Sequence, residues 1–196
     1  MADPEGPGAG RGRALPGFES PAAGTEAPLE MLAACHGRIE RHLDLIERLA
    51  GHLARAGADA SARDAAAQLL RYFGTAVPLH HADEEQDLFP ALHEAVAGSD
   101  AVCLRALTEG LATQHRRLDA AWEALRPVLR RLADGAPFDA AADWPADAAA
   151  AFLAANHEHL AREDGELLPM AARLLDAAAL AAIGRAMRER RGIPAV

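Results

Sequence analysis

From Pro28 onward, apolar residues recur along the chain at alternating steps of three and four positions, the spacing of one helix face. One such stripe runs from Leu32 to Leu53, and another runs from Leu104 to Leu132. Two less apolar stripes run from Ala66 to Leu88 and from Phe152 to Met170. We find no strand-like alternation of useful length. The pattern therefore predicts four long amphipathic helices.

Glycine-containing breaks separate these helices, at residues 56–59, 98–100 and 134–139. Each break combines a glycine, which can end a helix, with a polar residue able to cap the next one. Ser99 is a candidate cap for the third helix and Asp143 for the fourth. Short turns between long helices predict an all-α fold, an up-down-up-down antiparallel four-helix bundle.

The predicted domain is the bundle over residues 28–196, with a short C-terminal helix from about residue 176. Asp176 is a candidate cap for that last helix, and the arginines near its end suit the helix dipole. Prolines interrupt the helical segments and predict kinks. They are Pro78, Pro90, Pro127 and Pro169.

The first 27 residues are rich in Gly and Pro and offer little to bury, so we expect a disordered leader over 1–27. No apolar run approaches the roughly 20 residues of a membrane span, and no signal-peptide core is present. Cys35 and Cys103 form no CxxC motif, which fits a reducing cytoplasm. The net charge of -9 argues against nucleic acid or an anionic membrane as partner.

Each stripe contains one histidine, and the four are His36, His80, His115 and His159. They lie 44, 35 and 44 positions apart, so their midpoints are 58, about 97.5 and 137, at the three breaks. Residues equidistant from a turn face each other in an antiparallel pair. The four histidines are therefore predicted to lie at one height, pointing inward.

The second and fourth helices each add an acid one turn later, Glu84 and Glu163, on the same face as the histidine. The two segments read "HHADEEQDLFP" and "HLAREDGELLP", which align as an internal repeat. Buried carboxylates are costly unless something neutralises them. Hydrogen-bonded histidinium pairs could do so, but a metal ion does it more directly, and we expect a metal site.

Nitrogen and carboxylate donors without thiolate suit iron or manganese, whereas a structural zinc site usually carries cysteine. Six protein donors are too many for one ion that still does chemistry. Two octahedral ions offer about twelve positions, of which four histidines and two bridging glutamates fill about eight. The remainder leaves room for an oxo or hydroxo bridge and for a small molecule such as oxygen, peroxide or nitric oxide.

These segments resemble the hemerythrin-like family with its HHE cation-binding signature. The similarity covers roughly residues 29–175 and includes "QHRRLDAAW" on the third helix. It implies a four-helix bundle around an oxo- or hydroxo-bridged non-haem di-iron centre. The implied ligands are His36, His80, Glu84, His115, His159 and Glu163. Ferritin-like bundles instead use Glu-x-x-His, which this chain lacks.

The chain departs from the oxygen-carrying members at Asp119, where they have a second histidine on the third helix. Those members also use an aspartate five positions after the last histidine, so Asp164 is an alternative to Glu163. The remaining histidines are expected at the surface, with His81 the best candidate for a supporting role beside the ligands. They are His42, His52, His81, His93 and His157.

Two classes of function fit a di-iron centre of this kind. In the first, the centre binds or senses oxygen, nitric oxide or redox state, or serves iron handling and stress protection. In the second, it is an enzyme that turns over peroxide or reduces nitric oxide. A third reading is a helical interaction module whose polar layer only specifies packing. The residues themselves assign no catalytic group and no protein partner.

Overall fold

The computed structural model describes residues 24–194, so the predicted leader lies outside the described residues up to residue 23. Its helices are α1 (Pro28–Ala56), α2 (Ala60–Arg71), α3 (Val77–Asp83), α4 (Phe89–Ala95), α5 (Ser99–Ala133), α6 (Ala140–Asp143), α7 (Ala146–Arg162), α8 (Leu168–Leu174) and α9 (Ala177–Arg190). Short π-helical turns join some of them directly. These turns are η1 (Tyr72–Ala76), η2 (Glu84–Leu88) and η3 (Glu163–Leu167).

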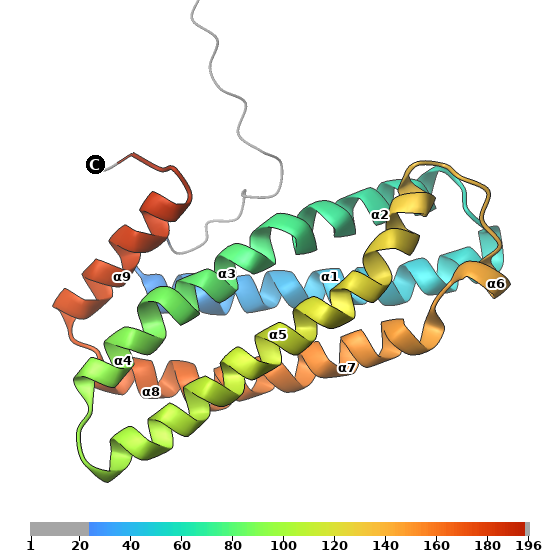
Figure 1. Cartoon of the computed structure of the whole chain (residues 1–196). Coiled ribbons are helices and arrows are strands. Elements are labelled where there is room, and N and C mark those ends of the chain that lie inside the picture. The colour runs from blue at the N-terminus through green and yellow to red at the C-terminus, as the bar shows by residue number, and fades with distance from the viewer. Residues whose placement is uncertain (1–23, 195–196) are drawn as a thin grey trace, which may run out of the picture.

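The predicted all-α bundle is confirmed. Helix α1, the continuous run from α2 to α4, helix α5 and the run from α7 to α8 pack antiparallel along one axis (Figure 1). Over residues 24–194 there is no strand. Helix α9 crosses one end of the bundle and packs against α1, α3 and η2. The bundle therefore places one side of α3 and η2 toward its core and another side toward α9.

The helix ends agree in part with the predicted caps. The side chain of Asp176 accepts a hydrogen bond from a backbone N–H in the first turn of α9, as predicted. Ser99 is instead the first helical residue of α5, because Gly98 takes the cap position with a φ of 70°. Asp143 does not cap α7, which follows Pro145. Its carboxylate instead accepts a hydrogen bond from the backbone N–H of Asp139, the residue that precedes α6.

Two apolar clusters fill the core, one toward each end of the bundle. The first contains the aromatic side chains Phe73, Trp122 and Phe152, whose rings pack edge-on or tilted against one another. The second lies toward α9 and is mostly leucine, with Phe89 and Met187. Between them lies a layer of buried polar side chains. The bundle therefore isolates this layer from water on both sides along its axis.

The π-turns change the register of the fourth stripe. The sequence pattern placed Glu166 and Met170 on the core stripe, but Glu166 is exposed and Met170 is only half-buried. Leu167 and Ala171 are buried in their place. A step of four residues overshoots a regular helical turn by about 40°, and the wider turn η3 absorbs that drift. The prediction was wrong there because it assumed a regular helix.

The three π-turns also explain the prolines. Pro78, Pro90 and Pro169 each stand two residues after a π-turn, at the start of the next α-helical segment. Proline cannot donate the backbone hydrogen bond of a helix interior, so a locally altered ladder accommodates it. Pro127, in contrast, lies inside α5, which continues past it as α-helix.

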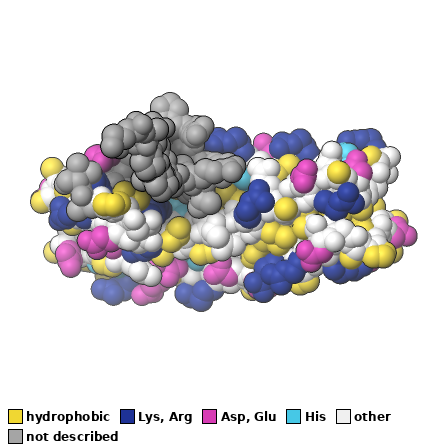
Figure 2. Space-filling view, turned by 90° about the horizontal axis from the view of Figure 1, so that it is seen from above, with side chains coloured by type: hydrophobic (Ala, Val, Ile, Leu, Met, Phe, Trp, Pro, Cys, Tyr) yellow, Lys and Arg dark blue, Asp and Glu magenta, His cyan; other side chains and the backbone are white. Residues whose placement is uncertain are grey.

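None of the described helices is long and apolar enough to cross a membrane. On the face seen in Figure 2, arginine and acidic side chains are interspersed over the described surface. The features that distinguish this bundle therefore lie in its interior.

Candidate metal centre

The structure brings the six sequence-predicted residues together in the buried layer. None of them has more than 2% of its surface exposed, and the two glutamates are fully buried. Helix α1 supplies one histidine, the α3–η2 junction supplies a histidine and a glutamate, α5 supplies a histidine, and the α7–η3 junction supplies the last pair. They are His36, His80, Glu84, His115, His159 and Glu163.

The nitrogen and oxygen atoms of the layer approach one another closely. Nε2 of His159 lies 3.1 Å from Oε1 of Glu163, and Nε2 of His36 lies 3.2 Å from its Oε2. On the other side, Nε2 of His115 lies 3.3 Å from Oε2 of Glu84. Two ligands at right angles around one ion, each about 2.1 Å from it, stand about 3 Å apart. The spacing fits donor atoms arranged around cations.

Most of these atoms lack a hydrogen bond among the described residues, even though they are buried. The orphaned atoms are Nε2 of His36, His80 and His159, both carboxylate oxygens of Glu84, and Oε2 of Glu163. An unsatisfied buried polar atom costs about 1–3 kcal/mol, and more when it is charged. A cation site would satisfy these atoms together, and the donor types suit one.

The outer nitrogens of three imidazoles, in contrast, have partners. Nδ1 of His36 lies 2.6 Å from Oδ1 of Asp164, and Nδ1 of His115 lies 2.7 Å from Oε1 of Glu85. Nδ1 of His159 lies 3.2 Å from the side-chain oxygen of Gln114. An acceptor at Nδ1 holds the proton there and leaves the Nε2 lone pair facing the layer. Asp164, offered as an alternative to Glu163, thus faces away from the centre.

The charges of the layer are strongly coupled in the metal-free protein. Burial lowers the pKa of His36, but contacts with Glu163 and Glu84 outweigh burial and raise it to about 11. The same balance raises the pKa of His115 to about 10. Burial raises the pKa of Glu163, yet the close contacts with His115, His159 and His36 bring it well below its ordinary value. Without metal, protons on the histidines balance the two carboxylates.

His81 is the off-stripe histidine that was singled out for a supporting role, and it lies beside the ligand candidates. It lies off the apolar stripe and was expected at the surface, but only 7% of it is exposed. Its ring stacks on that of His115, with centroids 3.9 Å apart and planes within 12°. The adjacent pair "HH" was the signal for this role, although the stripe alone would place His81 at the surface. Of the other off-stripe histidines, His157 is exposed as expected, whereas His42, His52 and His93 are half-buried.

Three further residues named from the sequence lie beside the layer. Cys35 is buried, and its sulfur accepts a hydrogen bond of 2.7 Å from Arg38. Asp119 is largely exposed, with Oδ1 3.9 Å from Nδ1 of His81. The ring of Tyr72 stacks on that of His42 at 3.6 Å. None of the three belongs to a group of donors that could hold an ion within the described residues.

Comparison with known proteins agrees with this geometry. The hemerythrin HHE cation binding domain matches residues 27–171 of the chain. An uncharacterized protein of Haemophilus influenzae is 30% identical over 166 residues, which cover 85% of this chain and 91% of that protein. The matched region contains the whole buried layer of histidines and glutamates. The chain therefore belongs to the hemerythrin HHE cation-binding family.

Proposed function

We propose that the buried layer holds two iron ions and that the protein is a non-haem di-iron protein that binds or senses oxygen, nitric oxide or redox state. One observation carries the proposal: the donors form two overlapping sets that share both carboxylates. One set is His36, His80, Glu84 and Glu163, and the other is Glu84, His115, His159 and Glu163. Shared glutamates support two neighbouring ions.

The donor types support iron. Four imidazoles and two carboxylates offer no thiolate, which suits iron or manganese better than structural zinc. Bound iron would supply a change of oxidation state and free positions for a small molecule. The six protein donors fill about eight of about twelve octahedral positions when both glutamates bridge.

The chain's own residues fit a protected binding site. Glu84 and Glu163 are fully buried between the two apolar clusters, so water has little access along the bundle axis. Asp164 and Glu85 fix the orientation of His36 and His115 from outside. Rigid, dry surroundings favour reversible binding because they limit side reactions with water.

A second candidate is an enzyme that turns over peroxide or reduces nitric oxide. One observation favours it: a pocket of about 600 Å³ reaches His115 from the surface between α3, η2 and α5. Its lining includes Glu85 and Asp119, which are groups able to exchange protons with water. Turnover needs such a supply of protons, whereas simple gas binding does not.

Iron content and gas binding of the purified full chain test the proposal. We expect about two irons per folded chain and a visible absorption of a bridged di-iron centre. The reduced protein should form a lasting species with oxygen or nitric oxide, observed by stopped-flow absorbance. Steady peroxide consumption well above that of free iron would instead support the enzyme. The variant H157A is the matched control, because that histidine is exposed.

Iron-free protein after reconstitution with ferrous iron, still folded by circular dichroism, would contradict the proposal. A single tightly held ion per chain would contradict the two-ion centre specifically. Tight binding of manganese with no uptake of iron would support a metal site but contradict its assignment to iron.

A further inference from the structure

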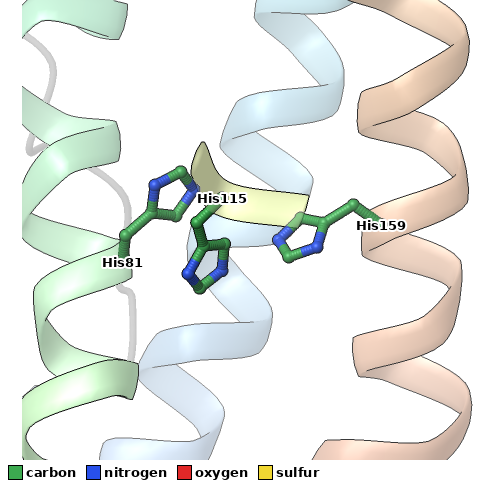
Figure 3. Close-up of side chains that lie close together, drawn as sticks. All are labelled: His81, His115 and His159. Carbon is green, nitrogen blue, oxygen red and sulfur yellow. The ribbon is translucent and has the colours of Figure 1, made fainter. Parts of the chain in front are cut away.

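The side chain of His81 borders both the surface pocket and the buried layer. It lines the pocket of about 600 Å³ between α3, η2 and α5. Its ring also contacts three histidines of the layer, with centroids 3.9 Å from His115, 5.8 Å from His80 and 6.0 Å from His159. In Figure 3 the rings of His81, His115 and His159 converge from α3, α5 and α7. The ring of His81 is therefore part of the wall between the pocket and the layer.

Neither usual role of a buried histidine fits His81. Its ring stacks on that of His115 with planes within 12°, so the lone pairs of the two rings lie in nearly parallel planes and cannot meet at one ion. In the part of the chain that the structure describes, the nearest acid to His81 is Asp119, at 3.9 Å, which is too long for a hydrogen bond. Packing alone thus holds the ring in place.

The pocket gives the His81 ring room to move outward. Small side chains border it beside the histidine, those of Gly74, Ala82 and Ala120. Its volume of about 600 Å³ is many times the ~30 Å³ that one water molecule takes up in the liquid. A helical side chain has two favourable rotamers about its Cα–Cβ bond. Rotation about that bond can therefore move the ring while α3 stays intact.

We propose that His81 is a gate: oxygen or nitric oxide enters the centre from this pocket when the His81 ring swings outward. This inference rests on the proposed di-iron function. One nitrogen of His81 lies within 4.8 Å of a nitrogen of both His115 and His159, so a molecule that passes the ring first meets the ion held by those two. The other half lies farther from the pocket, since none of the lining residues belongs to α1, which carries His36.

A second surface pocket offers no comparable entry. It has a volume of about 490 Å³ and lies between η2, α4 and α9, and none of the six ligand candidates lines it. Along the bundle axis, the two apolar clusters cover the layer from both ends. Of these two pockets, only the one at His81 leads to the layer, and the other provides a matched control.

A gate changes how fast a ligand enters and leaves but not how tightly it is bound, because the same barrier is crossed in both directions. The test follows nitric oxide binding to the reduced, iron-loaded full chain by stopped-flow absorbance, and its release after a nitric oxide scavenger is added. We expect H81A to bind and release about tenfold faster, within the roughly 1–3 decades that on-rates span among variants of one binding surface. The dissociation constant should not change. H81L, which keeps the bulk of the side chain without its nitrogens, should resemble the unaltered protein.

Filling the pocket from outside tests the route without altering the gate. A120W places a large side chain in the pocket from α5, and we expect binding and release about tenfold slower, with both irons retained. A182W is the matched control, because Ala182 is also exposed and lines the second pocket; its rates should equal those of the unaltered protein. Should A120W fail to fold, G74W fills the pocket from η1, where an added Cβ meets nothing within 4 Å.

The outcomes separate this inference from the function on which it rests. An unaltered protein that takes up no iron, or that binds no nitric oxide, overturns both. Two irons and nitric oxide binding, with equal rates in H81A, A120W and A182W, overturn only the gate. Loss of iron or a changed dissociation constant in both H81A and H81L also overturns the gate and makes His81 a positioning residue.

Discussion

Glu163 and Asp164 are adjacent carboxylates with opposite placements. Glu163 is fully buried among the imidazoles, while the side chain of Asp164 is half exposed and accepts from the outer nitrogen of His36. Glu84 and Glu85 repeat this arrangement on the other helix, with Glu85 beside His115. Each pair thus offers one carboxylate to the centre and one to a histidine of a different helix.

Replacing each carboxylate of the second pair should therefore have different results. E163Q removes a shared donor, and we expect loss of at least one of the two irons. D164N should keep both but bind them about 10–100-fold more weakly, as expected for a group behind a ligand. Chelator competition measures both, with the exposed E166Q as control. Greater iron loss in D164N than in E163Q would show that Asp164 is the ligand.

The titration of the layer predicts how the metal-free protein responds to pH. The raised pKa values of His36 and His115, about 11 and about 10, stabilise the folded protein. This contribution is fully present below pH 6.5, the ordinary pKa of histidine. This stability is lost as pH rises toward the folded values. The lowered pKa values of Glu84 and Glu163 also stabilise the folded protein. This contribution is present above pH 4.5, the ordinary pKa of glutamate, and is lost as the pH falls.

Metal-free protein should accordingly be most stable between about pH 4.5 and 6.5 and should weaken progressively toward pH 10. Melting temperatures across this range, followed by circular dichroism, measure the effect. The iron-loaded protein serves as comparison: bound ions replace these protons, so it should not lose stability as the pH rises through this range. A metal-free protein that grows more stable from pH 7 to 9 would contradict the assigned charges.

At the scale of elements, the sequence predicted the bundle well because its periodicity is strong. The whole stripe from Leu104 to Leu132 is buried as predicted, and the equal spacing from the turns placed the four histidines in one layer. The π-turns could not be predicted, because they depend on how side chains pack across the bundle and not on the helix propensity of the local sequence. They shifted Glu166 out of the core. The stripe alone would also have placed His81 at the surface, and only its position next to His80 marked it as an exception.

Deleting Gly165 tests what the turn η3 contributes. This glycine is exposed, and an added Cβ there would meet nothing within 4 Å. Removing it should close the wide turn to an ordinary helical one while Leu167 and Ala171 stay on the core stripe. We expect a folded, helical protein whose iron binding is at least about tenfold weaker, because Glu163 and Asp164 are displaced.

The matched control is Gly165→Ala, which keeps the residue count. It should hold iron normally and gain about 0.5–1 kcal/mol of stability, since alanine favours helix over glycine. Chelator competition and urea denaturation provide the two readouts. Unchanged iron binding in the deletion variant would mean that the π-turn has no part in positioning the carboxylates.

At the scale of the whole molecule, ion pairs connect helix α9 to the bundle beside the candidate metal centre. Arg190 and Arg191 both form ion pairs with Asp83, whose side chain is only 1% exposed. Arg190 also contacts Asp87 at 2.7 Å, and Arg191 donates to the backbone of α9. Asp83 directly precedes Glu84, so this contact joins the end of the chain to the segment that carries two of the candidate ligands.

Removing both arginines should leave Asp83 buried without its partners. We expect R190A/R191A to lose about 3–5 kcal/mol of unfolding free energy, the usual cost of breaking a buried pair from one side. Urea denaturation of the metal-free protein measures the loss. Adding D83L to the same variant should recover most of it, because the unpaired charge is then gone. Equal stability of the double and triple variants would contradict a buried charge at Asp83.

The layer of histidines and glutamates has a consequence for when the protein can mature. Its members come from α1, α3, η2, α5, α7 and η3, and Glu163 is the last of them along the chain. Because a chain is synthesised from its N-terminus, the proposed two-ion centre cannot close until η3 has left the ribosome. Iron content would then separate finished chains from interrupted ones: a product ending before His159 keeps three of the four donors of the first set and two of the second, and holds no complete centre.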